Sequence, residues 1–468
     1  MKAKQTFTHK LKRAFSGPSF PAEGIFYYRL NKENDKKRIH LRIDPDGQGL
    51  LIINANQVIH LNPSAALMAY FHLEGRSKLE ISKALHRRFQ VTHSRAHQDY
   101  QLFIAQLEDL LQPNGACPVC DLNIETTLPF SAKPSAPYRM DLALTYRCNN
   151  NCSHCYNARS RQYPEMSVEK WKQVIDKVWA LRIPHIVFTG GEPTLFSGLV
   201  ELVQHAEETG LITGLNTNGR KLADPGYLKR LIDAGLDHVQ VTLESHDPAI
   251  HDLMVGVKGA WAETVAGIRN IIASRLYVMT NTTLLKHNYE TIETTLQFLS
   301  ELDVPTIGLN ALIYAGKGRN VGTGLHEEEL PGILDTASQI TAANHQRLIW
   351  YTPTQYCHFN PMQLNLGVKG CTAALYNMCV EPNGDVIPCQ SYYQSLGNLL
   401  EVSWDDIWEH PLALTLRNRD DVPEGCKSCD FFPECGGGCP LAREHQTIDP
   451  IQNPILKAER IEWSNRNG

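Results

Sequence analysis

The stretch Arg147-Cys148-Asn149-Asn150-Asn151-Cys152-Ser153-His154-Cys155-Tyr156 places three cysteines on one short loop, directly after a segment that predicts a strand. Three thiolates can bind a [4Fe–4S] cubane and leave its fourth iron open, whereas a structural zinc ion takes four closed ligands. Cys148, Cys152 and Cys155 are therefore candidate ligands of a cubane. His154, which stands between two of them, is expected to pack against or orient its neighbours.

From Met140 onward, strand-like and helix-like segments alternate, which is typical of a parallel sheet with crossover helices. One helix is predicted over Ser167–Leu181, where apolar residues recur at helical spacing. Six strands are predicted: Leu142–Tyr146, His185–Thr189, Thr213–Thr217, His238–Leu243, Val278–Leu285 and Thr306–Ile313. The fold class is therefore α/β, with a partial (β/α)6 TIM-like barrel. The cysteine loop lies at the carboxyl end of its first strand, where barrel enzymes collect their catalytic residues.

Residues 138–350 resemble the radical S-adenosylmethionine (SAM) superfamily. The resemblance rests on the three-cysteine loop and on Gly190-Gly191-Glu192-Pro193 after the second strand. It implies that this GGEP stretch contacts the amino group of SAM, and glycines permit such close backbone approach. Weaker matches at later strand ends imply contacts with the ribose, the carboxylate and the adenine: Asn216, Asn218, Thr242, Glu244, Asn281, Thr283, Leu312 and Ile313. The alternative is that the two asparagines form a turn and the later polar residues are ordinary strand positions.

The reaction implied by this resemblance starts with reduction of the cubane. SAM, chelated to the open iron, then breaks into methionine and a 5′-deoxyadenosyl radical, which takes a hydrogen atom from the substrate. The cofactor carries the difficult step, while the protein orients it and excludes water.

Eight of the thirteen cysteines lie between Cys357 and Cys439. An odd number of cysteines at short spacings, without a secretory signal, favours metal ligation over disulfides. Their spacing, with four residues between Gly384 and Cys389, resembles the SPASM extension over about residues 357–440. The resemblance implies auxiliary [4Fe–4S] clusters, a nearer one on Cys371, Cys379, Cys389 and Cys439 and a farther one on Cys426, Cys429 and Cys435.

The farther cluster usually takes its fourth ligand from a later cysteine, and no cysteine follows Cys439. The candidates for this position are Cys357, His445, Asp449 or an open iron. Zinc remains the alternative for the whole cysteine-rich tail, because paired cysteines also build zinc sites.

Residues 40–112 are predicted to form a small winged-helix-like α+β domain. Two apolar runs, Gly49–Asn54 and Gln57–Leu61, predict a strand pair, and three helices follow, the second with a Ser77/Glu80 capping box. Gly49-Leu50-Leu51-Ile52, Leu61-Asn62-Pro63 and Gly75 resemble the peptide-binding module of PQQ biosynthesis, also called the RiPP recognition element. This implies binding of a leader peptide as an added strand. A packing module without a ligand is the alternative.

The chain of 468 residues is long enough for about three domains. The expected boundaries are a basic N-terminal segment (1–39), the peptide-recognition-like domain (40–112), a linker (113–137), the radical SAM core (138–350), the SPASM domain (351–445) and a tail (446–468). Cys117 and Cys120 of the linker are plain thiols, a redox pair or metal ligands. A net charge of −5 gives no reason to expect nucleic acid as a partner. No apolar run is long enough to predict a membrane-spanning helix. A cytoplasmic location is therefore expected.

Together, these segments predict a maturase that modifies a ribosomally made peptide or a partner protein by crosslinking, thioether formation or epimerisation. The substrate is expected to bind through the N-terminal module, and the electron donor to be a flavodoxin or ferredoxin. One alternative is a radical SAM enzyme acting on a small molecule or tetrapyrrole. Another is a non-catalytic metal-binding scaffold.

Overall fold

The computed structural model describes residues 21, 23–32, 35–53, 57–110, 134–274 and 276–445. Most of the basic N-terminal segment, Cys117, Cys120 and Asp449 lie outside the described residues. The chain divides into two compact units, Met1–Ser135 and Ala136–Gly468, and each unit has its own apolar core. Within the described parts, the helices are too short or too polar to cross a membrane.

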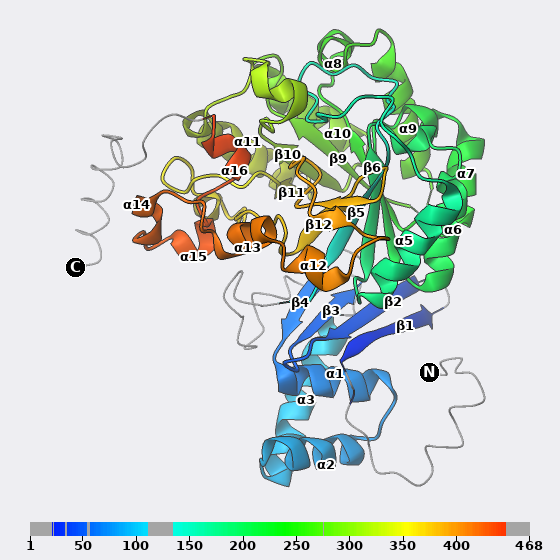
Figure 1. The fold of residues 1–468 in the computed structure, drawn as a ribbon, viewed down its shortest axis with the longest axis vertical. Coiled ribbons are helices and arrows are strands. Elements are labelled where there is room, and N and C mark those ends of the chain that lie inside the picture. Colours follow the sequence, from blue (N-terminus) through cyan, green and yellow to red (C-terminus); the bar gives the residue numbers. More distant parts are fainter. Residues whose placement is uncertain are drawn as a thin grey trace. The chain divides into compact units, whose positions relative to one another are not determined.

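The N-terminal unit is a four-stranded antiparallel sheet followed by three helices (Figure 1). In chain order these are β1 (Gly24–Lys32), β2 (Asp35–Ile43), β3 (Gly49–Ile53), β4 (Gln57–Leu61), α1 (Pro63–Leu73), α2 (Lys78–Phe89) and α3 (His93–Leu110). The predicted strand pair and three helices are confirmed. The expected boundary at residue 40 is wrong, because it cuts through β2 and leaves out β1. Phe26 and Tyr28 of β1 pack against the core of this unit.

Helix beginnings in this unit follow the predicted caps. The Asn62 side chain accepts a hydrogen bond from Ala65 N at 2.9 Å. The Ser77/Glu80 capping box is present in both directions, at 2.9 Å from Ser77 N to Glu80 Oε2 and 3.3 Å from Glu80 N to Ser77 Oγ. Such caps satisfy main-chain donors that a helix leaves without partners, each worth about 1 kcal/mol.

The second unit is built on a ten-stranded sheet in the order β11-β10-β9-β8-β7-β6-β5-β12-β13-β14. Neighbouring strands from β5 to β11 are parallel: β5 (Arg139–Thr145), β6 (His185–Gly190), β7 (Ile212–Thr217), β8 (His238–Thr242), β9 (Tyr277–Thr283), β10 (Thr306–Asn310) and β11 (Arg347–Trp350). The six predicted strands are confirmed, and β11 extends the series by one short strand that the prediction missed.

The cysteine-rich tail joins this same sheet. Strand β12 (Asn377–Val380) pairs with β5 in parallel, with Cys379 opposite Asp141. Strands β13 (Asp385–Ile387) and β14 (Gly397–Asn398) continue antiparallel beyond it. The tail is therefore attached to the strand that leads into the three-cysteine loop.

Amphipathic helices cover the parallel strands. Helix α5 (Val168–Ala180) matches the predicted segment, with Ser167 as its N-cap, and buries Trp171 and Val174. Burial of such side chains stabilises the fold by about 1.5–3 kcal/mol each. The other helices of the unit are α6 (Leu199–Thr209), α7 (Pro225–Asp233), α8 (Pro248–Val255), α9 (Ala260–Ile272), α10 (Ile292–Glu301), α11 (Leu330–Ala343), α12 (Trp404–Trp408), α13 (Pro411–Asn418), α14 (Glu424–Lys427), α15 (Phe432–Cys435) and α16 (Pro440–Arg443).

Candidate active site

The three-cysteine loop follows β5 and is held by main-chain contacts on both sides. Asn151 N donates to Val255 O at 2.8 Å, and Lys317 N donates to Cys155 O at 2.9 Å. Burial raises the pKa of Cys148 to about 11 and also raises that of Cys152, and the nearby Cys155 thiol contributes to both shifts. The structure therefore brings the three predicted thiols together, and each thiol would lose its proton on binding iron.

The GGEP stretch lies against the main chain that enters this loop. Gly191 N donates to Thr145 O at 2.7 Å, and Glu192 N donates to Arg147 O at 2.8 Å. A Cβ on Gly191 would lie 2.4 Å from Arg147 O, and one on Gly190 would lie 2.2 Å from Thr145 O. Because any side chain would clash with the main chain at these distances, only glycine fits at these two positions.

The Glu192 carboxylate is buried and joins the ends of two strands. It accepts hydrogen bonds from Thr217 Oγ1 at 2.7 Å and Asn218 N at 2.8 Å, besides those from Thr194. Burial raises the pKa of Glu192, and these hydrogen bonds oppose the rise. The side chain thus positions the loop after β7. Pro193 begins the short 3-10 turn Pro193–Leu195 that follows.

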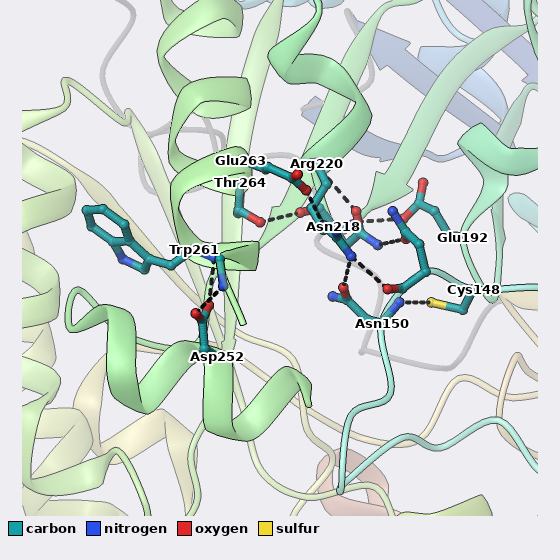
Figure 2. A network of polar contacts seen from close by, with 12 residues as sticks. Cys148, Asn150, Glu192, Asn218, Arg220, Asp252, Trp261, Glu263 and Thr264 are labelled. Carbon is teal, nitrogen blue, oxygen red and sulfur yellow. Dashed lines mark hydrogen bonds and ion pairs between the residues drawn. The ribbon is translucent and has the colours of Figure 1, made fainter. Parts of the chain in front are cut away.

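Asn218 and Arg220 hold the cysteine loop from the side of β7 (Figure 2). Asn218 Nδ2 donates to Asn149 Oδ1 at 2.7 Å. Arg220 Nη1 donates to Asn149 O at 2.7 Å and to Asn150 Oδ1 at 2.9 Å, while its Nε donates to Glu263 at 2.5 Å. Arg220 was not predicted as a site residue, although it directly follows Asn216-Thr217-Asn218-Gly219. Asn216 itself lies on β7, paired with β8.

Glu244 links the end of β8 to the cysteine loop and to β9. Its Oε1 lies 2.9 Å from His154 Nε2, and its Oε2 accepts from Thr283 N at 2.9 Å. Asn288, which was also not predicted, donates to Glu244 O at 2.7 Å and to Thr283 O at 2.9 Å. His154 thus contacts Glu244, and its orienting role stays a prediction. Thr242 ends β8 opposite Asn281.

Two features near the strand ends suit a polar ligand with an apolar ring. Asn281 Oδ1 is buried and has no hydrogen-bond partner among the described residues, so it can accept from a bound donor. Leu312 packs with Met254 and Leu285 in a small apolar cluster. Ile313 O lies 2.5 Å from where a Gly318 Cβ would stand, so the loop after β10 closes tightly here. These groups fit the amino acid and adenosyl ends of SAM.

The tail cysteines form two groups. In the first, burial raises the pKa of Cys371 and Cys439, and that of Cys389 to about 12, and the Cys439 and Cys389 thiols contribute to the shift of Cys371. Cys379 differs from these three, because it is buried in a cluster with Ala143, Tyr146 and Ile387. Burial raises the pKa of Cys379, and the Asp141 and Glu381 carboxylates and the Cys389 thiol add to this rise.

The second group contains Cys426, Cys429 and Cys435, with Cys357 beside them. Burial raises the pKa of Cys435 to about 11 and also that of Cys426, and Cys357 contributes to both shifts. The His445 ring instead stacks on Tyr314, with ring centres 5.3 Å apart. Among the described residues, no three His, Cys, Asp or Glu side chains lie close enough to share a single metal ion. A cubane spreads its ligands over separate irons and suits this looser spacing.

A buried polar network joins the cysteine loop to the tail. Arg159 donates from Nε and Nη2 to the two oxygens of Glu381, each at 2.7 Å, and Tyr146 OH donates to Glu381 Oε1 at 3.0 Å. The Glu381 side chain is fully buried. Because Glu381 directly follows β12, this ion pair fixes the first tail strand to the segment around Cys155.

This geometry agrees with two family models that match the chain. The radical SAM superfamily matches residues 142–299, and the iron–sulfur cluster-binding domain, SPASM, matches residues 371–430. The chain therefore contains a radical SAM domain and an SPASM domain. A radical SAM domain implies a [4Fe–4S] cluster with SAM, and an SPASM domain implies auxiliary iron–sulfur clusters.

Individual proteins are also similar to this chain in sequence or in fold. The chain is 29% identical over 335 residues to the PqqA peptide cyclase of Ruegeria pomeroyi, covering 68% of this chain and 87% of the relative. Its fold is similar to Streptococcus suis SuiB bound to the precursor peptide SuiA, with a TM-score of 0.65 and 16% identity over 90% of this chain and 98% of SuiB. Native anSMEcpe with bound AdoMet and the Kp18Cys peptide matches with a TM-score of 0.53 and 18% identity, over 67% and 91% of the two chains.

Proposed function

We propose that this enzyme uses SAM-derived radical chemistry to modify a ribosomally made peptide or a partner protein. The observation that carries the proposal is the joining of three parts in one chain. These are a small sheet-and-helix unit, a three-cysteine loop on a parallel sheet and a second set of cysteines in a tail whose strands join the same sheet. The PqqA peptide cyclase and SuiB, the latter bound to a precursor peptide, are similar along most of the chain.

In this proposal, Cys148, Cys152 and Cys155 hold the cluster that binds SAM. The bound cofactor supplies the hydrogen-abstracting radical when one electron enters and the sulfonium bond breaks. The protein's part is to bind and orient SAM. Main chain at Gly190 and Gly191 faces the amino group, while Asn281 Oδ1 and the apolar cluster around Leu312 contact other parts of the ligand.

The N-terminal unit is proposed to recognise the substrate peptide. Strands β1 and β4 hold the two outer positions of its sheet, and an extended peptide can add to such a sheet as a further strand. The unit has an apolar core of its own.

Two further proposals concern the setting of the reaction. The electron is proposed to come from a small redox protein such as a flavodoxin or ferredoxin. A reducing cytoplasm is proposed as the location, because all eleven cysteines within the described residues are free thiols.

The test is to co-express the enzyme anaerobically with each short reading frame beside its gene and to measure the peptide masses. A mass change or crosslink that depends on Cys152 supports the proposal. The same peptide without its N-terminal part should be modified with a much higher KM, because it lacks the segment that the N-terminal unit binds. Unmodified peptides together with turnover of a small metabolite would overturn the proposal in favour of the small-molecule alternative.

A further inference from the structure

The segment around Cys357 touches the thiol of Cys435 directly. Tyr356 N donates to Cys435 Sγ at 3.4 Å, and Cys435 Sγ donates to Thr354 O at 3.7 Å. Main-chain N–H bonds to sulfur are a common way in which proteins surround iron–sulfur ligands and tune the cluster. Cys357 is the next residue after this donor.

Close backbone packing fixes this contact. Gly436, Gly437 and Gly438 follow Cys435, and all three have positive φ. A Cβ on Gly438 would lie 3.0 Å from Gln355 N and 3.1 Å from Thr354 C. The loop between Cys435 and Cys439 can therefore lie against residues 354–355 only with glycine at this position.

The segment is also held from its other side. Glu327 Oε2 accepts from Gln355 N at 3.0 Å, and Thr354 Oγ1 donates to Phe359 O at 3.0 Å. Tyr356 OH accepts from Lys369 N at 2.9 Å. Because the main chain is fixed before and after Cys357, the position of this thiol is set by the fold and not by a mobile loop.

The structure also separates the other described candidate from this group. His445, another candidate for the same place, stacks on Tyr314 in the loop after β10. Of these two candidates, Cys357 is therefore the one whose segment contacts the farther group. It precedes the matched segment 371–430.

We propose that Cys357 is the fourth thiolate ligand of the farther auxiliary cluster, completing a set with Cys426, Cys429 and Cys435. The ligand that closes this cluster then comes from upstream of the matched segment 371–430, out of the residues that follow β11. Each bound thiol releases its proton as its sulfur binds iron. A cluster closed by four cysteines has no open iron for substrate, so its role is confined to accepting or passing electrons. The proposal rests on the SPASM domain and not on the identity of the peptide.

The test compares variants of the full chain after anaerobic reconstitution. Cys357→Ala and Cys429→Ala are expected to give the same loss of up to about four irons and four sulfides per chain, and the same missing signal in the electron paramagnetic resonance (EPR) spectrum of the reduced protein. His445→Ala is the matched control and should keep both. The signal that responds to added SAM should persist in all three variants, which separates this test from that of the proposed function.

A second variant guards against a folding defect. Cys357→Asp offers an oxygen ligand, and it should retain iron while shifting the EPR signal of the farther cluster alone. A merely structural role for Cys357 would leave that signal at its original position. Wild-type iron content and unchanged spectra in both Cys357 variants would overturn the assignment, as would loss of the signal in His445→Ala.

Discussion

The Glu244 carboxylate meets the His154 imidazole at 2.9 Å, so the end of the fourth parallel strand is tied to the loop that carries the three cysteines. Both side chains are almost completely buried, with 1% and 9% exposure. The second oxygen of Glu244 binds Thr283 N at the end of β9. One carboxylate thus sets the spacing of three segments around the proposed SAM site.

Glu244→Gln should lower kcat/KM for SAM cleavage by about 10- to 100-fold, because a buried hydrogen bond to a charged group is worth about 1.5–3 kcal/mol. The production of 5′-deoxyadenosine at several SAM concentrations measures this. Glu263→Gln is the control. Its carboxylate is half exposed in its ion pair with Arg220, so less than a fivefold change is expected. Equal effects of the two variants would contradict the positioning role of Glu244.

Gly191→Ala should abolish SAM binding or prevent cluster assembly, because the added Cβ would lie 2.4 Å from Arg147 O. Neither atom can move without shifting the main chain that leads into the cysteine loop. Gly332→Ala is the matched control, since no atom lies within 4 Å of its Cβ and it stands on a helix. The control should be neutral or stabilising by up to about 1 kcal/mol. SAM binding followed by calorimetry distinguishes the two variants.

Arg159→Met should destabilise the protein by about 3–5 kcal/mol, because it leaves the buried Glu381 carboxylate without its cation. The double variant Arg159→Met/Glu381→Met should recover much of this loss, since it removes both charges. Thermal unfolding of the two variants measures the difference. If the double variant is no more stable than the single one, the ion pair is not the source of the effect.

Acid should destabilise the second unit through His238. Its Nε2 lies 2.9 Å from His185 Nε2, and burial lowers its pKa to about 4. The unfolded chain takes up this proton near pH 6.5, before the folded chain does. The stabilisation is therefore complete above about pH 6.5 and is lost as pH falls toward 4, by about 3 kcal/mol. His238→Gln should flatten the dependence of unfolding free energy on pH, whereas His287→Gln, at an exposed position, should leave it unchanged.

Much of the architecture could be predicted because its signals are local. Strand and helix periodicity located the six strands and α5, and the cysteine spacing with GGEP located the candidate site. Arg220 and Asn288 were missed because they act through contacts with residues 44 to 71 positions away, which no local pattern shows. Strand β1 was missed because the residues before it are strongly basic, although its aromatic side chains pack on the core.

The central claim is that Cys148, Cys152 and Cys155 hold a cluster that cleaves SAM. The most direct measurement is 5′-deoxyadenosine formed by anaerobically reconstituted enzyme with dithionite and SAM, compared with a Cys152→Ala variant. We expect formation by the wild type and loss below about 1% in the variant, while the EPR signals of the auxiliary clusters remain. Equal 5′-deoxyadenosine from both proteins, or none from a wild type that carries its full iron, would contradict the claim.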